Sequence, residues 1–195
     1  MSKLIVFDVD GTFLDSHGLF EKVVLEYSRA QGLPEPCLKT IRHGYGDPHA
    51  HDFRWGVSRE EQVKHLFAAY IINDDITMRG DPNYTPDLFD GVPESLAKLK
   101  DDGHTLAVIT SKAEAPLLHL LDMHNIKKFF STHRAYDDIQ RRREREKPAP
   151  DMLHSVMLEL GFIPEDTVMV GDTSMDIRMG NSAGVPARQT VTALR

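Results

Sequence analysis

The chain has 195 residues, of which 41% are hydrophobic and 27% charged, and its formal net charge is -7 at pH 7. This composition is typical of a globular protein with a buried core, and the acidic balance disfavours binding to nucleic acid or to an anionic membrane surface, but not to a small phosphorylated metabolite. Cys37 is the only cysteine, so the sequence excludes internal disulfides and zinc-thiolate clusters, and we expect a cytoplasmic protein.

The first predicted element is a buried strand at residues 3–7. Its apolar run is rich in β-branched residues and is closed by two acidic residues and a glycine. This pattern is typical of a parallel strand that ends at a functional loop.

Residues 16–86 differ from the rest of the chain because they contain helical patterns, at residues 19–30 and 58–72, but no good strand. Ser58 and Glu61 have the spacing of a capping box at the start of the second helix. A stretch rich in proline and aspartate, residues 80–86, resembles a linker. We therefore predict two domains, an α/β core at residues 1–15 and 87–195 and an inserted α-helical domain at residues 16–86.

Strand and helix patterns alternate after this insertion. Strong strands are predicted at residues 105–109 and 167–170, and weaker ones around residues 129–133 and 185–191; helices are predicted at residues 93–103, 117–123 and 152–160. The count favours about five parallel strands with helices on both faces. The predicted fold class is α/β, with a Rossmann-like parallel sheet.

Acidic residues directly follow the first strand and the strand at residues 167–170. They are Asp8 and Asp10 at the first, and Asp172 and Asp176 at the second. Ligands of open α/β sheets bind outside the carboxyl ends of the strands, so we expect these side chains to converge. Converging carboxylates repel each other, and Mg²⁺ is a fitting counterion because it prefers oxygen ligands and leaves positions for phosphate oxygens and water.

The alternation of side chains along a strand predicts that Asp8 and Asp10 lie on one side. One carboxylate could then attack a substrate while the other protonates the leaving oxygen. Gly11 would allow a sharp turn over the site.

Phosphoryl transfer also requires positive charge and hydrogen-bond donors. Thr110 and Ser111 follow a strand and are predicted to open a helix, where hydroxyls and free amides bind anions. Lys147 precedes the helix at residues 152–160, and the prolines beside it restrict the loop.

Four sequence segments in this order carry a resemblance to a known family. They are DVDGT at residues 8–12, the strand that ends at Thr110, KPAPD at residues 147–151 and GDTSMD at residues 171–176. The set resembles the four ordered motifs of the haloacid dehalogenase-like hydrolase superfamily, and it is most similar to the phosphoglycolate phosphatase-like branch, which has a helical cap after the first strand. Order and spacing make the match specific.

The resemblance implies a role for each motif residue. Asp8 is expected to be the nucleophile that forms an aspartyl-phosphate, and Asp10 the general acid and base. The residues expected to bind the substrate are Gly11, Thr110, Ser111 and Lys147. Thr110 and Lys147 are also expected to take part in catalysis. The expected Mg²⁺ ligands are the Asp8 and Asp172 carboxylates and the Asp10 backbone carbonyl, with Asp176 as a further ligand through water or beside the ligands. The inserted helices are expected to form a lid that excludes water and selects the leaving group.

Three functions fit parts of this pattern. The first is a Mg²⁺-dependent phosphatase for a small phosphorylated metabolite, with phosphoglycolate suggested by similarity alone. The second is a sugar phosphomutase of the beta-phosphoglucomutase type. The third is a receiver-like phospho-accepting signalling domain, which the insertion and the Asp172 and Asp176 pair disfavour. Asp10 together with Asp172 disfavours dehalogenation of carbon. No pattern in the sequence identifies the substrate or decides between a monomer and a homodimer.

The remaining clusters of histidine, basic and aromatic residues are not expected to form a functional site. His43, His49 and His51 lack the spacing of a metal site. The basic run at residues 141–145 is expected to be a solvated face. The aromatic residues of the insertion are expected to pack within it, namely Phe53, Trp55, Phe67 and Tyr70.

Overall fold

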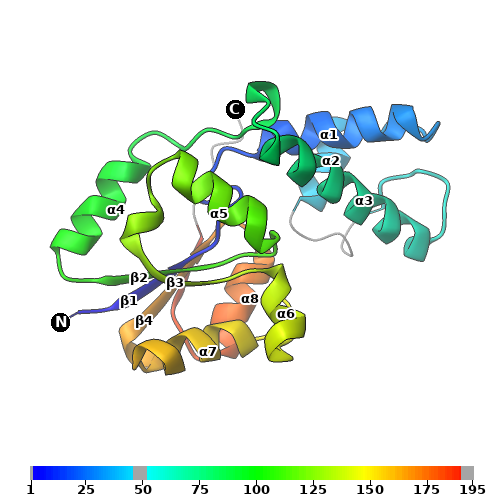
Figure 1. Cartoon of the computed structure of the whole chain (residues 1–195). Helices are drawn as coiled ribbons and strands as arrows, with labels where there is room; N and C mark the ends of the chain where they lie inside the picture. Colours follow the sequence, from blue (N-terminus) through cyan, green and yellow to red (C-terminus); the bar gives the residue numbers. More distant parts are fainter. Residues whose placement is uncertain (1, 46–51, 190–195) are drawn as a thin grey trace. The chain divides into compact units, whose positions relative to one another are not determined.

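The computed structural model describes residues 2–45 and 52–189 of the chain. The chain divides into two compact units (Figure 1). The first, which we call the core unit, consists of Met1–Asp15 and Leu88–Arg195, and the second, the helical unit, is Ser16–Asp87. No helix of the described residues is both long enough and apolar enough to cross a membrane.

The core unit contains a five-stranded parallel sheet in the order β3-β2-β1-β4-β5. The strands are β1 (Leu4–Phe7), β2 (Thr105–Ile109), β3 (Phe130–Arg134), β4 (Thr167–Gly171) and β5 (Ala187–Gln189). β1 is central, and its last residue, Phe7, is in register with Val108 of β2 and Val170 of β4. The carboxyl ends of these three strands therefore reach the same edge of the sheet, directly before the predicted site residues.

Five α-helices cover the two faces of the sheet. They are α4 (Val92–Asp101), α5 (Glu114–Met123), α6 (Tyr136–Arg142), α7 (Asp151–Leu160) and α8 (Ser174–Ser182), with short 3-10 turns η2 (Lys127–Phe129) and η3 (Pro164–Asp166). Figure 1 shows α4 and α5 on one face and α7 and α8 on the other. Residues of β1 alternate between these faces, because Leu4 and Val6 pack with α7 and α8 while Ile5 and Phe7 pack against the α4 and α5 side. The predicted α/β class with helices on both faces is confirmed.

The helical unit contains α1 (His17–Ala30), α2 (Leu38–Gly44), α3 (Arg59–Met78) and the 3-10 turn η1 (Pro82–Tyr84). The predicted capping box is present, since the Ser58 side chain accepts a hydrogen bond from the Glu61 amide and the Glu61 carboxylate accepts one from the Ser58 amide. The buried residues Phe53 and Trp55 join the apolar core of this unit. Phe67 is the most exposed of these four aromatic residues, with 37% of its area exposed, and its packing within the unit stays a prediction.

The observed helices differ from the predicted ones where polar residues interrupt the apolar pattern or where the helix is short. The helix predicted at residues 58–72 continues to Met78, and the buried Thr77 hydroxyl donates to the carbonyl of Asn73 at 2.9 Å. The patterns do not predict α2, α6 or α8. The first two have seven residues each, too few to display a helical period. Thr110 and Ser111 do not open a helix either, because α5 begins at Glu114.

Candidate active site

A buried lysine lies between two buried aspartates at the carboxyl edge of the sheet. Lys147 Nζ donates to Asp8 Oδ1 at 2.5 Å and to Asp176 Oδ1 at 2.7 Å, and all three residues are buried. Asp8 follows β1, and its amide donates to the carbonyl of Val170 in β4. Three segments that are distant in the sequence therefore meet at one ammonium group.

Asp176 is held from both sides. Its Oδ1 accepts from Lys147, while its Oδ2 accepts from the Thr173 amide at 3.1 Å and from the Thr173 hydroxyl at 2.7 Å. It lies in the first turn of α8, where a negative charge is favoured by the helix dipole. Asp176 is therefore both an acid of the first turn of α8 and a member of the acidic cluster.

Gly171, at the end of β4, leaves the space that Asp176 occupies. A Cβ at this position would lie 2.3 Å from Asp176 Cγ, and the hydrogen bonds of the carboxylate prevent it from moving aside. We expect Gly171→Ala to lower the free energy of unfolding by about 1–3 kcal/mol, as overpacking does. Chemical denaturation measures this change. The matched control is Gly18→Ala, because a Cβ on Gly18 meets nothing within 4 Å, and an equal loss in both variants would contradict the steric account.

Asp172 completes an acidic cluster with the two buried aspartates. Asp8, Asp172 and Asp176 each offer a carboxylate oxygen, and these oxygens lie within 4.8 Å of one another. The Thr12 hydroxyl donates to Asp172 Oδ1 at 3.4 Å. Oxygen donors gathered this closely are the set that a hard divalent cation prefers.

Burial and neighbouring charge act on the acid–base properties of the cluster. Burial raises the pKa of Asp8 well above its ordinary value, and the charges of Asp176 and Asp172 raise it further, while Lys147 partly offsets the shift. Burial opposes the charged form of Lys147, but the charges of Asp176 and Asp8 outweigh it and raise the pKa of the ammonium. Lys147 therefore remains a cation in the folded protein, and a second cation would favour ionised Asp8.

Asp10 has a different partner from Asp8. Its Oδ2 lies 3.3 Å from Nζ of Lys112, whose side chain is almost buried. Strand alternation does not extend to these two residues, because β1 ends at Phe7 and the chain then turns, with the amide of Leu14 donating to the carbonyl of Val9. That Asp8 and Asp10 lie on one side therefore stays a prediction. Sequence reasoning missed Lys112, although its position directly after Thr110 and Ser111 was an available signal.

The polar residues after β2 form a tight loop before α5. Thr110 is buried, and its Oγ1 accepts from the Lys112 amide at 3.1 Å, which leaves the hydroxyl proton to be donated. Ser111 is exposed at the same loop. Gly11 is buried with φ of 77°, a left-handed conformation that favours glycine.

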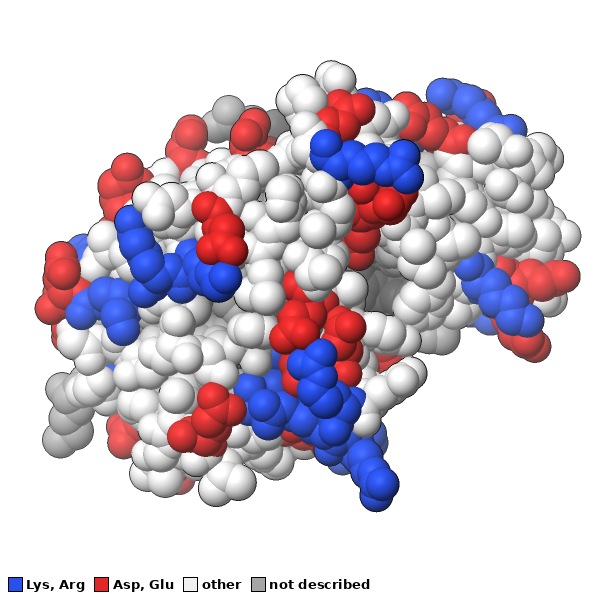
Figure 2. Space-filling model, in the orientation of Figure 1, with Lys and Arg blue, Asp and Glu red and all other residues white. Residues whose placement is uncertain are grey.

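The basic run at residues 141–145 is paired with acids at the surface. Figure 2 shows Lys and Arg side chains gathered with acidic ones over α6. Arg141 pairs with Glu114 at 2.8 Å, Arg142 with Asp138, and Arg145 with Asp151 at 2.7 Å. Hydrogen bonds from Arg141 and then His133 lower the pKa of Glu114 to about 2. The expectation of a solvated face fits these exposed, paired side chains, and the pair Arg145 and Asp151 ties the loop that holds Lys147 to α7.

The histidine-rich stretch contributes no metal cluster among the described residues. His43 lies at the end of α2, and its Nδ1 is 2.7 Å from the carbonyl of Lys39. His49 and His51 lie outside the described residues.

Comparisons with known proteins agree on one family. The model of the family described as haloacid dehalogenase-like hydrolase matches residues 5–189. The chain is 31% identical to a protein named Probable phosphatase IndB of Dickeya dadantii, over 96% of this chain and 80% of that protein. It is 29% identical to a phosphoglycolate phosphatase of Aliivibrio fischeri, over 93% and 81% of the two chains. A haloacid dehalogenase-like family hydrolase of Streptococcus pneumoniae has a similar fold, with a TM-score of 0.73 and 22% identity over 95% of this chain and 83% of that one.

Proposed function

The chain belongs to the haloacid dehalogenase-like hydrolase family, and we propose that it is a Mg²⁺-dependent phosphatase that hydrolyses a small phosphorylated metabolite through an aspartyl-phosphate. The phosphatase names of its relatives support the activity. The observation that supports the mechanism best is the buried set of Asp8, Lys147 and Asp176 with Asp172 beside it. A receiver-like signalling domain does not fit this family assignment.

The acidic cluster fits Mg²⁺ by its chemistry. Asp8 and Asp176 share the Lys147 ammonium and Asp172 lies in the same cluster, so a divalent cation would complete the charge balance of the three carboxylates. The Asp8 and Asp172 carboxylates and the Asp10 carbonyl would hold the ion, with Asp176 as a further or outer ligand. When bound, Mg²⁺ would neutralise charge that develops on the phosphoryl oxygens.

Asp8 is the proposed nucleophile because it is buried beside Lys147 at the end of β1, whereas both carboxylate oxygens of Asp176 already accept hydrogen bonds from Lys147 and Thr173. Its oxygen forms a bond to phosphorus while the bond from phosphorus to the leaving oxygen breaks. Asp10, which is half-buried, gives its proton to that leaving oxygen. In the second half-reaction Asp10 takes a proton from water, the water oxygen attacks phosphorus, and the Asp8 carboxylate is released with inorganic phosphate.

Thr110, Ser111 and Lys147 are the proposed phosphate-binding groups. The Thr110 hydroxyl can donate to a phosphoryl oxygen, since its own acceptor position is used by the Lys112 amide. Lys147 offsets the repulsion between an anionic phosphate and the Asp8 carboxylate. Gly11 lies in the turn that follows β1 and has no side chain to block the approach of a phosphate to the backbone.

We further propose that the helical unit Ser16–Asp87 acts as the cap that excludes water from the reaction. The phosphoglycolate phosphatase among the relatives suggests a small phosphate monoester as the substrate class.

A screen of phosphorylated metabolites with and without Mg²⁺ tests this function. We expect release of inorganic phosphate from at least one small monoester, loss of this activity in excess EDTA and its recovery when Mg²⁺ is restored. Release of phosphate in EDTA at the rate seen with Mg²⁺ would contradict the metal requirement. A product that is an isomeric sugar phosphate, formed without phosphate release, would instead identify a phosphomutase.

Asp172→Asn tests the metal site by concentration. Because the substitution removes one charged oxygen from the cluster, we expect the Mg²⁺ concentration for half-maximal activity to rise by about tenfold or more. The matched control is Asp166→Asn, which removes an acid that is exposed and pairs with Lys3. The proposed ligand set is wrong if both variants have the Mg²⁺ dependence of the unmodified enzyme.

A further inference from the structure

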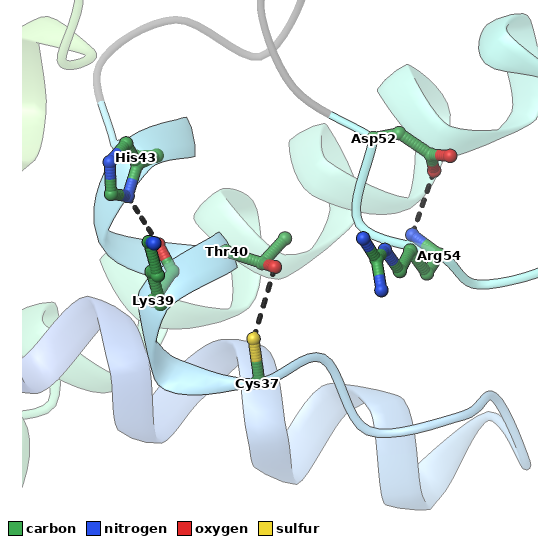
Figure 3. A pocket seen from close by; sticks show the side chains of 6 residues that line it. All are labelled: Cys37, Lys39, Thr40, His43, Asp52 and Arg54. Atoms are coloured by element: carbon green, nitrogen blue, oxygen red, sulfur yellow. Dashed lines mark hydrogen bonds between the residues drawn. The ribbon is translucent and has the colours of Figure 1, made fainter.

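The helical unit contains a cavity of about 450 Å³ beside the start of α2. It is lined by Cys37, Lys39, Thr40, His43, Asp52 and Arg54 (Figure 3). None of these residues belongs to the Asp8 cluster. The lining combines two permanent cations with a hydroxyl and a thiol, a set of donors suited to an anion.

The two cations of the cavity form no ion pair with the residues that the structure describes. Neither Lys39 nor Arg54 has an ion-pair partner in the part of the chain that the structure describes, whereas Arg29, Arg42 and Lys64 of the same unit each pair with a glutamate. Among the described residues of the lining, the carboxylate is that of Asp52, and its Oδ1 accepts a hydrogen bond from the Arg54 amide at 2.7 Å. An anion in the cavity would therefore meet an excess of positive charge.

The backbone directs Arg54 into the cavity. Its φ of 58° lies in the left-handed region, which is uncommon for a residue other than glycine. The Asp52 carboxylate holds this turn through the amide of Arg54. Figure 3 shows the Arg54 side chain extending toward Thr40 and Cys37, away from the Asp52 carboxylate. A conformation that costs free energy thus places a guanidinium opposite the hydroxyl and the thiol.

The pKa of the Cys37 thiol depends on its neighbours in the cavity. Its Sγ lies 3.2 Å from Thr40 Oγ1, and the thiol is exposed. The hydrogen bond with the Thr40 side chain is the largest of the effects that lower the pKa of Cys37, and the charge of Arg54 adds to them. The positive charge of Arg54 is therefore close enough to act on the sulfur.

We propose that this cavity binds the phosphate group of a small phosphorylated molecule, with Lys39 and Arg54 as the charged contacts. The Arg54 guanidinium can bind two phosphate oxygens at once, and Lys39 adds a point charge. This inference does not depend on the phosphatase activity, because it uses no residue of the Asp8 cluster.

Alkylation of Cys37 tests the site, since it is the only cysteine of the chain. Iodoacetamide is neutral and iodoacetate is an anion; with either, the thiolate forms a bond to carbon and iodide leaves. The measured quantity is the ratio of the two rate constants, iodoacetate over iodoacetamide, relative to the same ratio for uncharged N-acetylcysteinamide. The charge of Arg54, with Lys39 in the same lining, should raise this ratio about threefold or more at low ionic strength.

Inorganic phosphate provides the direct binding test. We expect it to slow alkylation of Cys37 by iodoacetamide in a saturable manner. The double variant Lys39→Gln with Arg54→Asn should lose both this protection and the raised ratio; asparagine is chosen because it tolerates a positive φ. Circular dichroism checks that the variant is folded.

The matched control is Lys64→Gln, which removes an exposed cation of the same unit that pairs with Glu60. It should retain the raised ratio and the protection by phosphate. The proposal is overturned if phosphate gives no saturable protection, if the ratio equals that of the reference thiol, or if the double variant and Lys64→Gln behave alike.

Discussion

Asp8→Asn is expected to abolish phosphate release, with a fall in kcat of at least about 10⁴-fold, because the amide oxygen is a poor nucleophile for phosphorus. Asparagine has nearly the same size as aspartate, so the buried position after β1 stays filled. A generic aryl phosphate measures the change, since its leaving group needs little assistance from an acid. Turnover near that of the unmodified enzyme would refute the proposed role of Asp8.

The same substitution should not destabilise the protein. Asp8 and Asp176 share a single ammonium, and Asp172 lies within the same cluster. In Asp8→Asn, Lys147 keeps its bond to Asp176, and one of the repelling buried charges is gone. We therefore expect the free energy of unfolding without Mg²⁺ to be equal to or greater than that of the unmodified protein.

The contribution of Asp8 to the free energy of unfolding is expected to decrease as the pH rises. The pKa of Asp8 is raised in the folded state above its ordinary value of 3.8, so over that interval the folded protein binds more protons than the unfolded chain. Its contribution to stability is full below 3.8 and is lost as the pH rises through the folded-state pKa. Urea denaturation over a pH series without Mg²⁺ should show that Asp8→Asn lacks this loss, and a parallel pH dependence in both proteins would contradict it.

The architecture was predictable because strands and caps are local features. The runs that became β1, β2 and β4 are continuous apolar segments of a buried parallel sheet, and the capping box of Ser58 and Glu61 needs only four consecutive residues. Because ligands of open α/β sheets bind outside the carboxyl ends of the strands, the sequence also predicted that Asp8 and Asp172 would lie close together. The 4.8 Å limit on the distances between their oxygens agrees with that expectation.

The details that the sequence did not reveal depend on contacts between distant segments. Lys112 was missed because its position directly after Thr110 and Ser111 places it near the site but does not show that its ammonium lies beside Asp10. The exact course of residues 9–14 depends on hydrogen bonds from Phe13 and Leu14 back to Val9, which a period-two strand pattern cannot express. The 37% exposure of Phe67 depends on how α3 is rotated about its axis, which a single aromatic residue in the sequence does not determine.

Lys147→Met is expected to have the second large effect, on both stability and catalysis. Methionine fills much of the same space but leaves the buried Asp8 and Asp176 carboxylates without their cation. Removing one partner from a buried ionic cluster costs about 3–5 kcal/mol of stability. We also expect kcat to fall by about 10²–10³-fold in the fraction that remains folded, because an oriented donor to the reacting group is lost. Lys98→Met, at an exposed lysine paired with Asp102, is the matched control and should be near neutral.

A double-mutant cycle separates repulsion from the loss of packing. If Lys147 stabilises the fold by offsetting both carboxylates, then Lys147→Met should cost less in the Asp8→Asn background, where the lysine serves Asp176 alone. Residues in direct contact commonly show coupling energies of about 0.5–3 kcal/mol, and we expect a value of about 1 kcal/mol or more here. Equal costs in the two backgrounds would mean that methionine fails for steric reasons. The mutual repulsion of the acids would then not be the reason why a lysine is buried at this edge of the sheet.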